Sequence, residues 1–164
     1  MTTPTASSPV TLREITDTNR ADIIAFSVQP HQDGLVAPNS RSLSQASEHA
    51  YAWCRAIYAD DTPVGFAMLE DWSLAKGAEP ELYHGEPFVG LWRLMIDARY
   101  QGNGFGKRAM ELLIAHAKAR PGVTNMVLSY VPKSGNPEGF YKKFDFARTG
   151  EDVDGEIVMI RGLG

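Results

Sequence analysis

The sequence predicts an α/β domain built on a sheet of mixed direction, and three patterns indicate it. In Leu91–Arg120 an apolar run breaks into a glycine-rich turn at Gln101–Gly106 and continues as an amphipathic helix. Val123–Val131 is nearly all apolar, which is typical of a strand buried on both faces beside a parallel neighbour. Turn-bounded runs before and after this strand–helix–strand unit predict antiparallel strands.

The N-terminal segment predicts a short lead-in, one strand and one helix. Met1–Pro9 is rich in Thr, Ser and Pro and is expected to be a disordered lead-in to a single domain over residues 10–164. Val10–Glu14 alternates like a first strand. Asp17–Asn19 then offers capping side chains for a short helix that ends near Val28.

A loop, a second helix and a hairpin are predicted next. Gln29–Asn39 contains two prolines and a glycine, so we expect a loop. Ser42 and Gln45 form a capping-box pattern, which predicts a helix from Ser42 through about Ala50. Two strand-like runs then flank an Asp-Asp-Thr-Pro turn: Arg55–Tyr58 and Val64–Leu69.

The remaining segments surround the glycine turn. Asp71–Pro87 is predicted to be a long loop, and loops of that length are usually functional. Phe88–Ile96 is the predicted central strand, and the helix after the turn ends at Pro121-Gly122. Pro137–Phe144 fits a short helix. A closing hairpin around Asp154-Gly155 is predicted from two runs: Phe146–Gly150 and Glu156–Arg161.

Bulk composition excludes several classes. The 164 residues contain no apolar run of membrane length, and the polar N-terminus is unlike a signal peptide. The single cysteine, Cys54, excludes an internal disulfide and fits a reducing cytoplasm; its apolar surroundings favour a buried thiol over a nucleophile. The net charge of −4 argues against nucleic acid and permits a cationic small molecule. Metal-ligand spacing is absent, so no metal is expected.

The glycine turn between a strand and a helix is a candidate phosphate site, because free backbone N–H groups and the helix dipole face an anion there. A P-loop would need Ser or Thr after Lys107, where Arg108 stands. Gly104, Gly106 and Ala109 meet the spacing of a dinucleotide fingerprint, but no acidic residue follows at the required distance. A connector that needs glycine only for its turn is the simplest alternative.

A third pattern, Gln/Arg-x-x-Gly-x-Gly/Ala, is matched by Gln101, Gly104 and Gly106. This segment resembles the pyrophosphate loop of the GNAT acetyltransferases. The run NPEGFYKKFDF, Asn136–Phe146, resembles the second GNAT signature, although Asp145 stands where the family usually has Gly. Four residues of that run match the signature: Phe140, Tyr141, Lys143 and Phe146.

The resemblance extends over nearly the full chain. Three further stretches are similar to the branch labelled spermine/spermidine or diamine N-acetyltransferase: Val28–Ala46, Ala56–Leu69 and Thr149–Met159. The GNAT fold that this implies is a central twisted, mostly antiparallel sheet with a splayed parallel pair, flanked by helices. The implied reaction is acetyl transfer from acetyl-CoA to a primary amine.

The resemblance also implies which residues hold acetyl-CoA. Backbone groups of the central strand would bind pantetheine and face the oxyanion, and the loop amides would hold the pyrophosphate. The family's Asn position is occupied by Ser134, so Asn136, two residues later, replaces it or leaves that contact unmade. The implied set is Leu94, Met95, Ile96, Gln101, Gly102, Asn103, Gly104, Phe105, Gly106, Lys107, Asn136, Tyr141 and Lys143.

Tyr141 is the candidate general acid for the departing thiolate, since a Tyr proton on a short hydrogen bond suits that step. The alternative is a core tyrosine that only packs its helix on the sheet. An alkyl amine is protonated at neutral pH, so a base is also required. Glu70 is favoured over His84 and Glu86, and solvent is the alternative.

The acceptor side is less defined. If the resemblance holds, His31 and Asn39 line the acceptor pocket, together with Glu70 and His84. A polyamine is one predicted acceptor; an antibiotic, an amino acid or a protein N-terminus is the alternative. A non-catalytic acyl-CoA-binding module is the rival from another class. The resemblance also allows a homodimer.

Overall fold

The computed structural model describes residues 2–75, 77 and 81–164. Met1 of the predicted lead-in, and residues 76 and 78–80 of the predicted loop Asp71–Pro87, lie outside the described residues. In chain order the elements are β1 (Val10–Arg13), α1 (Arg20–Ala25), η1 (Pro30–Gln32), α2 (Asn39–Glu48), β2 (Ala52–Ala59), β3 (Thr62–Glu70), η2 (Trp72–Leu74), β4 (Leu82–Tyr83), β5 (Glu86–Ile96), η3 (Ala98–Tyr100), α3 (Phe105–Lys118), β6 (Asn125–Tyr130), α4 (Glu138–Lys142), β7 (Ala147–Val153) and β8 (Glu156–Gly162).

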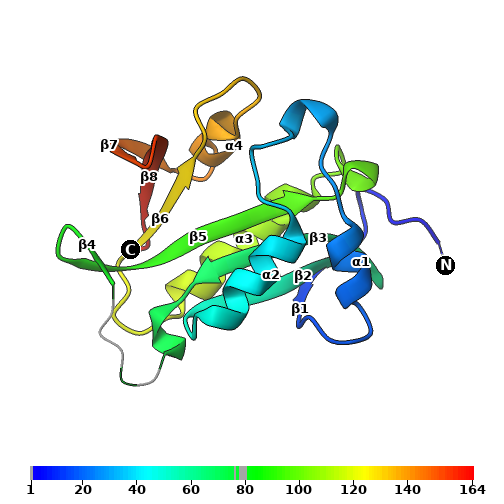
Figure 1. The fold of residues 1–164 in the computed structure, drawn as a ribbon, viewed down its shortest axis with the longest axis horizontal. Coiled ribbons are helices and arrows are strands. Elements are labelled where there is room, and N and C mark those ends of the chain that lie inside the picture. The colour runs from blue at the N-terminus through cyan, green and yellow to red at the C-terminus, as the bar shows by residue number, and fades with distance from the viewer. Residues whose placement is uncertain (1, 76, 78–80) are drawn as a thin grey trace.

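The strands join one sheet in the order β1-β2-β3-β5-β6-β8-β7, and β4 pairs with the beginning of β5 (Figure 1). Neighbouring strands are antiparallel except for β5 and β6, which are parallel. A parallel pair needs a crossover connection, and α3 supplies it. The predicted mixed sheet with one parallel pair is therefore confirmed.

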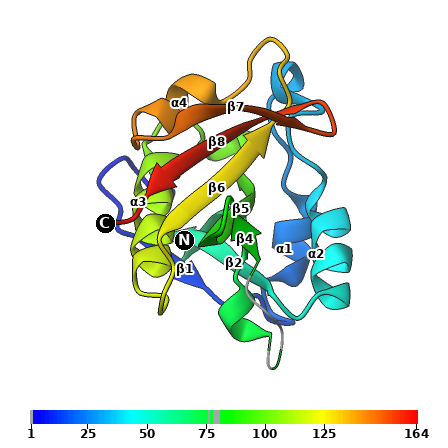
Figure 2. The ribbon, with the colours of Figure 1, turned by 90° about the vertical axis from the view of Figure 1, so that its left-hand side faces the viewer.

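Helices cover both faces of the sheet. Figure 2 shows α3 on one side of the strands and α1 and α2 on the other. The residues that predicted an amphipathic α3 are buried in the core between α3 and the sheet: Ala109, Met110, Leu113 and Ala117. A second cluster, which includes Ile23, Phe26 and Leu43, fills the space beneath α1 and α2.

β5 and β6 separate before they end, as Figure 1 shows. Their pairing runs from Phe88↔Asn125 to Leu91↔Leu128, whereas β5 continues to Ile96. On its other edge β5 stays paired with β3 as far as Gly65↔Ile96, with a register shift that leaves Trp92 as an extra residue. The shift is a β-bulge, which bends a strand and re-aims its side chains. Within the described strands, the last part of β5 thus has a free backbone edge towards β6.

The prediction that the strand after α3 is buried on both faces is wrong. Along β6 one face is buried, with Met126, Leu128 and Tyr130, whereas Ser129 on the other face is exposed. α1 and α2 lie over the β1–β3 side of the sheet and leave this face of β6 open (Figure 2). The open face adjoins the separation of β5 and β6.

Several predicted boundaries differ from the structure. α2 begins at Asn39, so the capping box predicted at Ser42 is wrong; the buried Ser42 hydroxyl accepts a hydrogen bond from Arg93 Nε at 3.2 Å. α1 already ends at Ala25, and the loop after it contains η1. The predicted loop Asp71–Pro87 contains η2 and β4, and β4 pairs with the beginning of β5 across a tight turn in which His84 and Gly85 both have positive φ.

The lead-in expected to be disordered lies against α3. Thr5 N–H donates to Ser8 Oγ at 2.9 Å, and Ser8 is buried. The Arg108 guanidinium donates to the carbonyls of Ala6 and Ser8. Arg108 therefore connects the N-terminal segment to the glycine turn, where it also donates to the carbonyl of Asn103.

Asp71, at the end of β3, forms a buried ionic contact with α3. Its carboxylate is 3.0 Å from His116 Nε2 and 3.4 Å from Arg120 Nε. Burial alone would raise the pKa of Asp71, but hydrogen bonds from His116 and Ser73 and the charge of Arg120 outweigh it and hold the pKa below its ordinary 3.8. The stabilisation is therefore present above pH 3.8 and is lost as the pH falls through the lower pKa of the folded state.

Asp71→Asn should lower the free energy of unfolding at pH 7 by about 2–3 kcal/mol, because it removes a buried carboxylate that His116 and Arg120, both partly buried, contact. Urea denaturation at pH 7 and again at pH 3 measures this, and the difference from wild type should shrink at pH 3. Asp61→Asn is the matched control, since the Asp61 side chain is 89% exposed. An equal loss of unfolding free energy in both variants would show that the Asp71 contacts do not stabilise the fold more than an exposed carboxylate does.

Candidate active site

The glycine turn opens α3 with unpaired backbone N–H groups. Gly102 and Gly104 have φ of 84° and 78°, a region in which side chains are strained, so both positions favour glycine. Gly104 is the N-cap of α3 and has no side chain to bond the first helical amides. These free amides and the helix dipole suit a pyrophosphate, as the resemblance implies.

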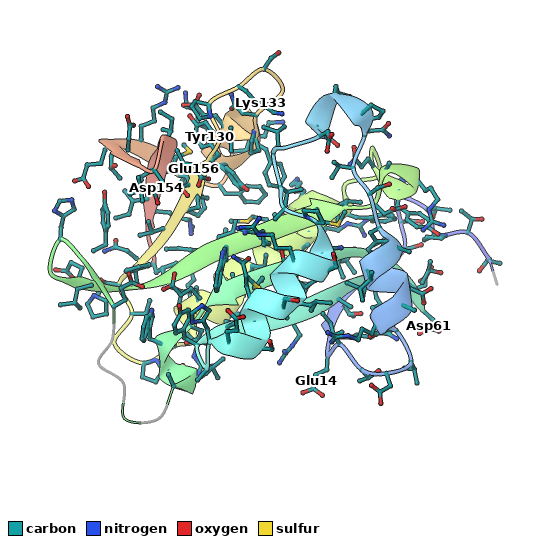
Figure 3. The ribbon with its side chains drawn as sticks, in the orientation of Figure 1. Glu14, Asp61, Tyr130, Lys133, Asp154 and Glu156 are labelled. Atoms are coloured by element: carbon teal, nitrogen blue, oxygen red, sulfur yellow. The ribbon has the colours of Figure 1, made fainter. Side chains whose placement is uncertain are left out.

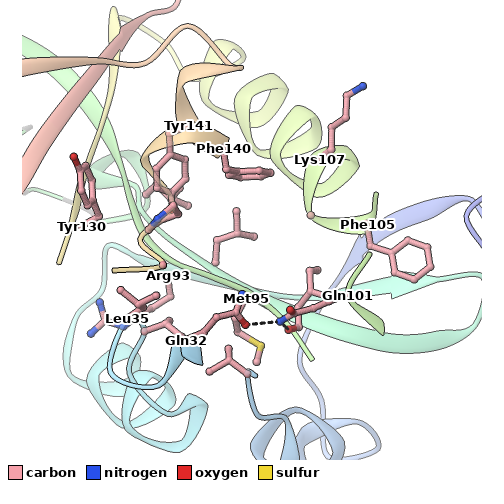
Figure 4. Close-up of a pocket in the computed structure, with 18 of the residues that line it drawn as sticks. Gln32, Leu35, Arg93, Met95, Gln101, Phe105, Lys107, Tyr130, Phe140 and Tyr141 are labelled. Atoms are coloured by element: carbon pink, nitrogen blue, oxygen red, sulfur yellow. Dashed lines mark hydrogen bonds between the residues drawn. The ribbon is translucent and has the colours of Figure 1, made fainter. Parts of the chain in front are cut away.

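A cavity of about 470 Å³ lies where the glycine turn, the separated part of β5 and α4 meet. Figure 4 shows Tyr141 and Phe140 on one side of it, and Met95 and Gln101 on the other. Most of the predicted cofactor residues line this cavity: Leu94, Met95, Ile96, Gln101, Gly102, Gly104, Phe105, Gly106, Lys107 and Tyr141. The free edge of β5 forms one wall, which suits an extended chain with amide groups such as pantetheine.

Tyr141 is buried, with 8% of its surface exposed, and it lines the cavity. Burial raises the pKa of Tyr141 to about 12. The hydroxyl therefore stays protonated at neutral pH and is available as a proton donor. This arrangement suits the predicted acid, although Tyr141 also packs against Phe140 and Phe146 as a core residue would.

Three predicted cofactor residues make other contacts and do not line the cavity. The Asn136 amide donates to the carbonyl of Lys133 at 2.8 Å and accepts from Glu138 N–H, so it caps the turn before α4. Asn103 Nδ2 donates to the Tyr100 carbonyl. Lys143 follows α4 with an exposed side chain.

Gln101 connects the glycine turn to two other segments. Its amide nitrogen donates to the Ile96 carbonyl and to Gln32 Oε1, both at 2.9 Å, and Figure 4 shows the bond to Gln32. The first bond fixes the turn to the end of β5, and the second fixes it to η1. Gln101, which was predicted to contact the cofactor, thus positions the glycine turn.

A second cavity of about 580 Å³ adjoins the first beneath the loop between α1 and α2. The two share wall residues: Val28, Leu35, Val36, Arg93, Met95 and Glu156. Asn39, a predicted acceptor residue, lies in the wall of the second cavity. Its amide, however, donates to the Ile23 carbonyl at 2.8 Å, so it also holds α1 to α2.

The other predicted acceptor residues lie outside both cavities. His31 belongs to η1, where its neighbour Gln32 reaches the first cavity instead. His84 is at the exposed turn between β4 and β5 and contacts Glu151 of β7. Glu70, the predicted base, ends β3 and is among the wall residues of neither cavity.

The cavity wall also contains polar residues that no sequence pattern indicated, among them Arg93, Tyr130 and Glu156. Figure 3 shows Tyr130 and Glu156 together, near the end of β6 and the beginning of β8. Arg93 donates to Ser42 Oγ and Gln45 Oε1, and burial lowers the pKa of its guanidinium. Tyr130 closes an apolar strand and Glu156 follows the Asp154-Gly155 turn, so only the pairing of β6 with β8 brings them to the cavity.

The structure gives little support to a cysteine nucleophile or a metal site. Burial raises the pKa of the Cys54 thiol to about 11, so the thiol is protonated and a poor nucleophile. In the described part of the chain, no three His, Cys, Asp or Glu residues are grouped to hold a metal ion. No helix over those same residues has the length and apolar character needed to cross a membrane.

Comparison with known proteins identifies the family. Residues 11–146 match the acetyltransferase (GNAT) family. A spermine/spermidine N(1)-acetyltransferase of Bacillus subtilis (strain 168) is 31% identical over 157 residues, which cover 94% of this chain and 99% of the relative. The L-2,4-diaminobutyric acid acetyltransferase of Streptomyces avermitilis is 28% identical over 137 residues, which cover 78% of this chain and 70% of the relative.

Solved structures share the fold. The aminoglycoside acetyltransferase AAC(6')-Ib, in complex with coenzyme A and kanamycin, superposes with a TM-score of 0.72 at 19% identity, covering 94% of this chain and 95% of that one. A PaiA N-acetyltransferase from Thermoplasma acidophilum, in complex with coenzyme A, gives 0.64 at 14% identity, with 94% and 99% covered. With its mixed sheet, glycine turn and family match together, the chain belongs to the GNAT acetyltransferase family.

Proposed function

We propose that the protein transfers the acetyl group of acetyl-CoA, the donor used by this family, to a primary amine of a polyamine. One observation carries the proposal: a single cavity joins the uncapped start of α3, the free edge of β5 and the protonated Tyr141. The similarity to the Bacillus subtilis spermine/spermidine acetyltransferase supports this acceptor class.

Different groups of the chain bind the cofactor, orient the thioester and donate the proton. The first amides of α3 and of the Gln101–Gly106 turn hold the pyrophosphate, and the edge of β5 over Leu94–Ile96 orients the thioester. A backbone N–H of that edge stabilises negative charge on the carbonyl oxygen. Tyr141 donates its proton to the departing sulfur.

The base is assigned to Glu156 in place of Glu70. Among the described residues that line the first cavity, Glu156 is the one carboxylate, and it also borders the second cavity. Ser129 Oγ donates to Glu156 Oε1 at 3.4 Å, a weak contact that leaves the carboxylate able to accept other protons. An alkylammonium can lose its proton to this group directly or through water.

An amine panel tests the proposal. CoA release from acetyl-CoA is followed with spermidine, spermine, putrescine and L-2,4-diaminobutyrate. We expect polyamine-dependent turnover that rises with amine concentration to saturation. Binding of acetyl-CoA without CoA release for any amine would refute the proposal and favour a non-catalytic acyl-CoA-binding module.

A diamino acid is the second candidate acceptor. Arg93 lies in the wall of both cavities and offers a cation to a substrate carboxylate. The similarity to a diaminobutyric acid acetyltransferase points the same way. Turnover with diaminobutyrate that exceeds turnover with every polyamine would favour this candidate.

We further propose a single domain over residues 10–164, a cytoplasmic location and a homodimer. The single sheet supports the first, and the lone reduced Cys54 fits the second. Dimerisation is a prediction from family resemblance that sedimentation can test.

A further inference from the structure

A group of aromatic rings and carboxylates lies beside the reactive cavity. It is formed where β2, β3 and the bulge of β5 come together, and Glu70, the predicted base, belongs to it. We call it the aromatic–carboxylate cluster; its members are His49, Tyr51, Glu70, Trp72, Glu81 and Trp92.

Tyr51 is the centre of the ring stack. Its ring centroid is 4.3 Å from that of Trp72, 5.0 Å from that of His49 and 6.1 Å from that of Trp92, and all three pairs are stacked. Each of these side chains is partly exposed, so the stack is a surface and not part of a closed core. Faces of Trp and Tyr attract ammonium groups through the ring quadrupole.

Two carboxylates lie against the same rings. Trp72 Nε1 donates to Glu70 Oε1 and to Glu81 Oε2, both at 3.0 Å, so one indole holds the two acids together. Burial and the neighbouring Glu81 raise the pKa of Glu70 to about 8. Ionisation of both neighbouring carboxyl groups is disfavoured because their negative charges repel, and a bound cation relieves that repulsion.

A glycine in β5 leaves space for the Glu70 carboxylate. Gly90 pairs with Glu70 across the β3–β5 ladder, and a Cβ at Gly90 would lie 3.1 Å from Glu70 Oε2. Without a side chain at Gly90, the Glu70 carboxylate can extend across β5 towards the open face beside β6. The acid is thereby directed to the side of the sheet that α1 and α2 leave uncovered.

Trp92 connects the cluster to the reactive cavity. As the extra residue of the bulge it lines the first cavity, while its ring stacks with Tyr51 and lies 5.9 Å from the His49 ring. The cavity that contains Tyr141 and the cluster that contains Glu70 thus share a wall.

We propose that the aromatic–carboxylate cluster binds a second, non-reacting ammonium group of the acceptor. This inference rests on the proposed acetyl transfer to amines and deepens it. The reacting amine lies in the cavity near Tyr141 while the distal ammonium contacts the Glu70 carboxylate and the exposed parts of the rings that stack around Tyr51. The protein therefore selects diamines and polyamines over monoamines of equal length.

Cadaverine and n-pentylamine test the selection, because they differ mainly in the distal ammonium. The ratio of kcat/KM for cadaverine to that for n-pentylamine is measured in wild type, Glu70→Gln and Tyr51→Leu. We expect at least a tenfold fall of the ratio in both variants, chiefly through KM for cadaverine. Glu111→Gln, on the outer face of α3, is the matched control and should keep the wild-type ratio.

Two kinetic outcomes would overturn the proposal. An unchanged ratio in both variants excludes the cluster as a subsite. A parallel fall for the two amines in Glu70→Gln would instead assign Glu70 to the reacting amine, as the sequence-based prediction of a base implies. Circular dichroism of each variant verifies that it is folded.

A binding measurement separates this proposal from the proposed function. Calorimetric titration of cadaverine and n-pentylamine into the protein without acetyl-CoA requires no turnover. We expect tighter binding of cadaverine, lost in Glu70→Gln; equal affinity of the two amines would refute the subsite. If no amine releases CoA in wild type, the proposed function fails, while the titration still decides whether the cluster binds an ammonium group.

Discussion

Tyr141→Phe should lower kcat by about 10²–10⁴-fold while leaving the Kd of acetyl-CoA nearly unchanged, because general acid catalysis contributes in that range. The substitution removes one hydroxyl from a buried ring and keeps its packing on Phe140 and Phe146. Steady-state kinetics with the preferred amine, together with calorimetric titration of acetyl-CoA, measures both quantities.

The pH profile offers a second test of the same role. Because the pKa of Tyr141 is raised to about 12, the proton donor stays protonated through the usual assay range. Loss of activity up to pH 9 should therefore not arise from this group. Tyr58→Phe is the control: Tyr58 is buried and accepts a hydrogen bond from Asn19 Nδ2 at 3.1 Å, away from the cavity. Wild-type kcat in Tyr141→Phe would leave Tyr141 with a packing role only.

Gly65→Ala should destabilise the protein by about 2–3 kcal/mol, as overpacking at a site that cannot yield does. A Cβ at Gly65 would lie 2.4 Å from the Met95 carbonyl oxygen and 2.8 Å from Ile96 Cδ1. The first contact is with backbone, so β3 and β5 must separate to relieve it. The displaced part of β5 is the edge that we propose orients the thioester, so acetyl-CoA binding should weaken too.

Thermal unfolding and acetyl-CoA titration measure these effects, with an expected fall of roughly 4–12 °C in Tm. Gly139→Ala is the matched control, since a Cβ at Gly139 in α4 meets no atom within 4 Å. Helical Gly→Ala changes at open positions are neutral or stabilising. A stable Gly65→Ala variant with normal acetyl-CoA affinity would show that the two strands can move apart at little cost.

Sequence patterns predicted the structure correctly where the residues of one segment determine its conformation. The apolar spacing of α3 required a sheet on one side of it, and Gly102 and Gly104 have the positive φ that the turn needs. The closing hairpin likewise follows from Asp154-Gly155, both with positive φ. Local backbone preference and hydrophobic period are properties of consecutive residues.

Sequence-based expectations were wrong where a contact with another segment determines the local structure. Ser42 had the pattern of an N-cap but bonds Arg93 inside α2, and Leu82–Tyr83 became a strand only by pairing with β5. Arg108 followed the glycine turn, yet the carbonyls of residues 6 and 8 bind its guanidinium. For Ser42 and Arg108 a contact over a long sequence separation outweighed the local pattern, whereas β4 pairs with the next few residues across a tight turn.

The sequence by itself indicated the family, the glycine turn and Tyr141 as a candidate acid, because the two motifs that carry them, Gln101–Gly106 and Asn136–Phe146, are runs of adjacent residues. Only the tertiary structure decided which acid lies near Tyr141. Strand register brings Glu156 to the cavity, whereas the bulge at Trp92 and the space above Gly90 direct Glu70 into the aromatic–carboxylate cluster. Acceptor chemistry depends on proximity through space, and strand pairing sets that proximity across dozens of residues.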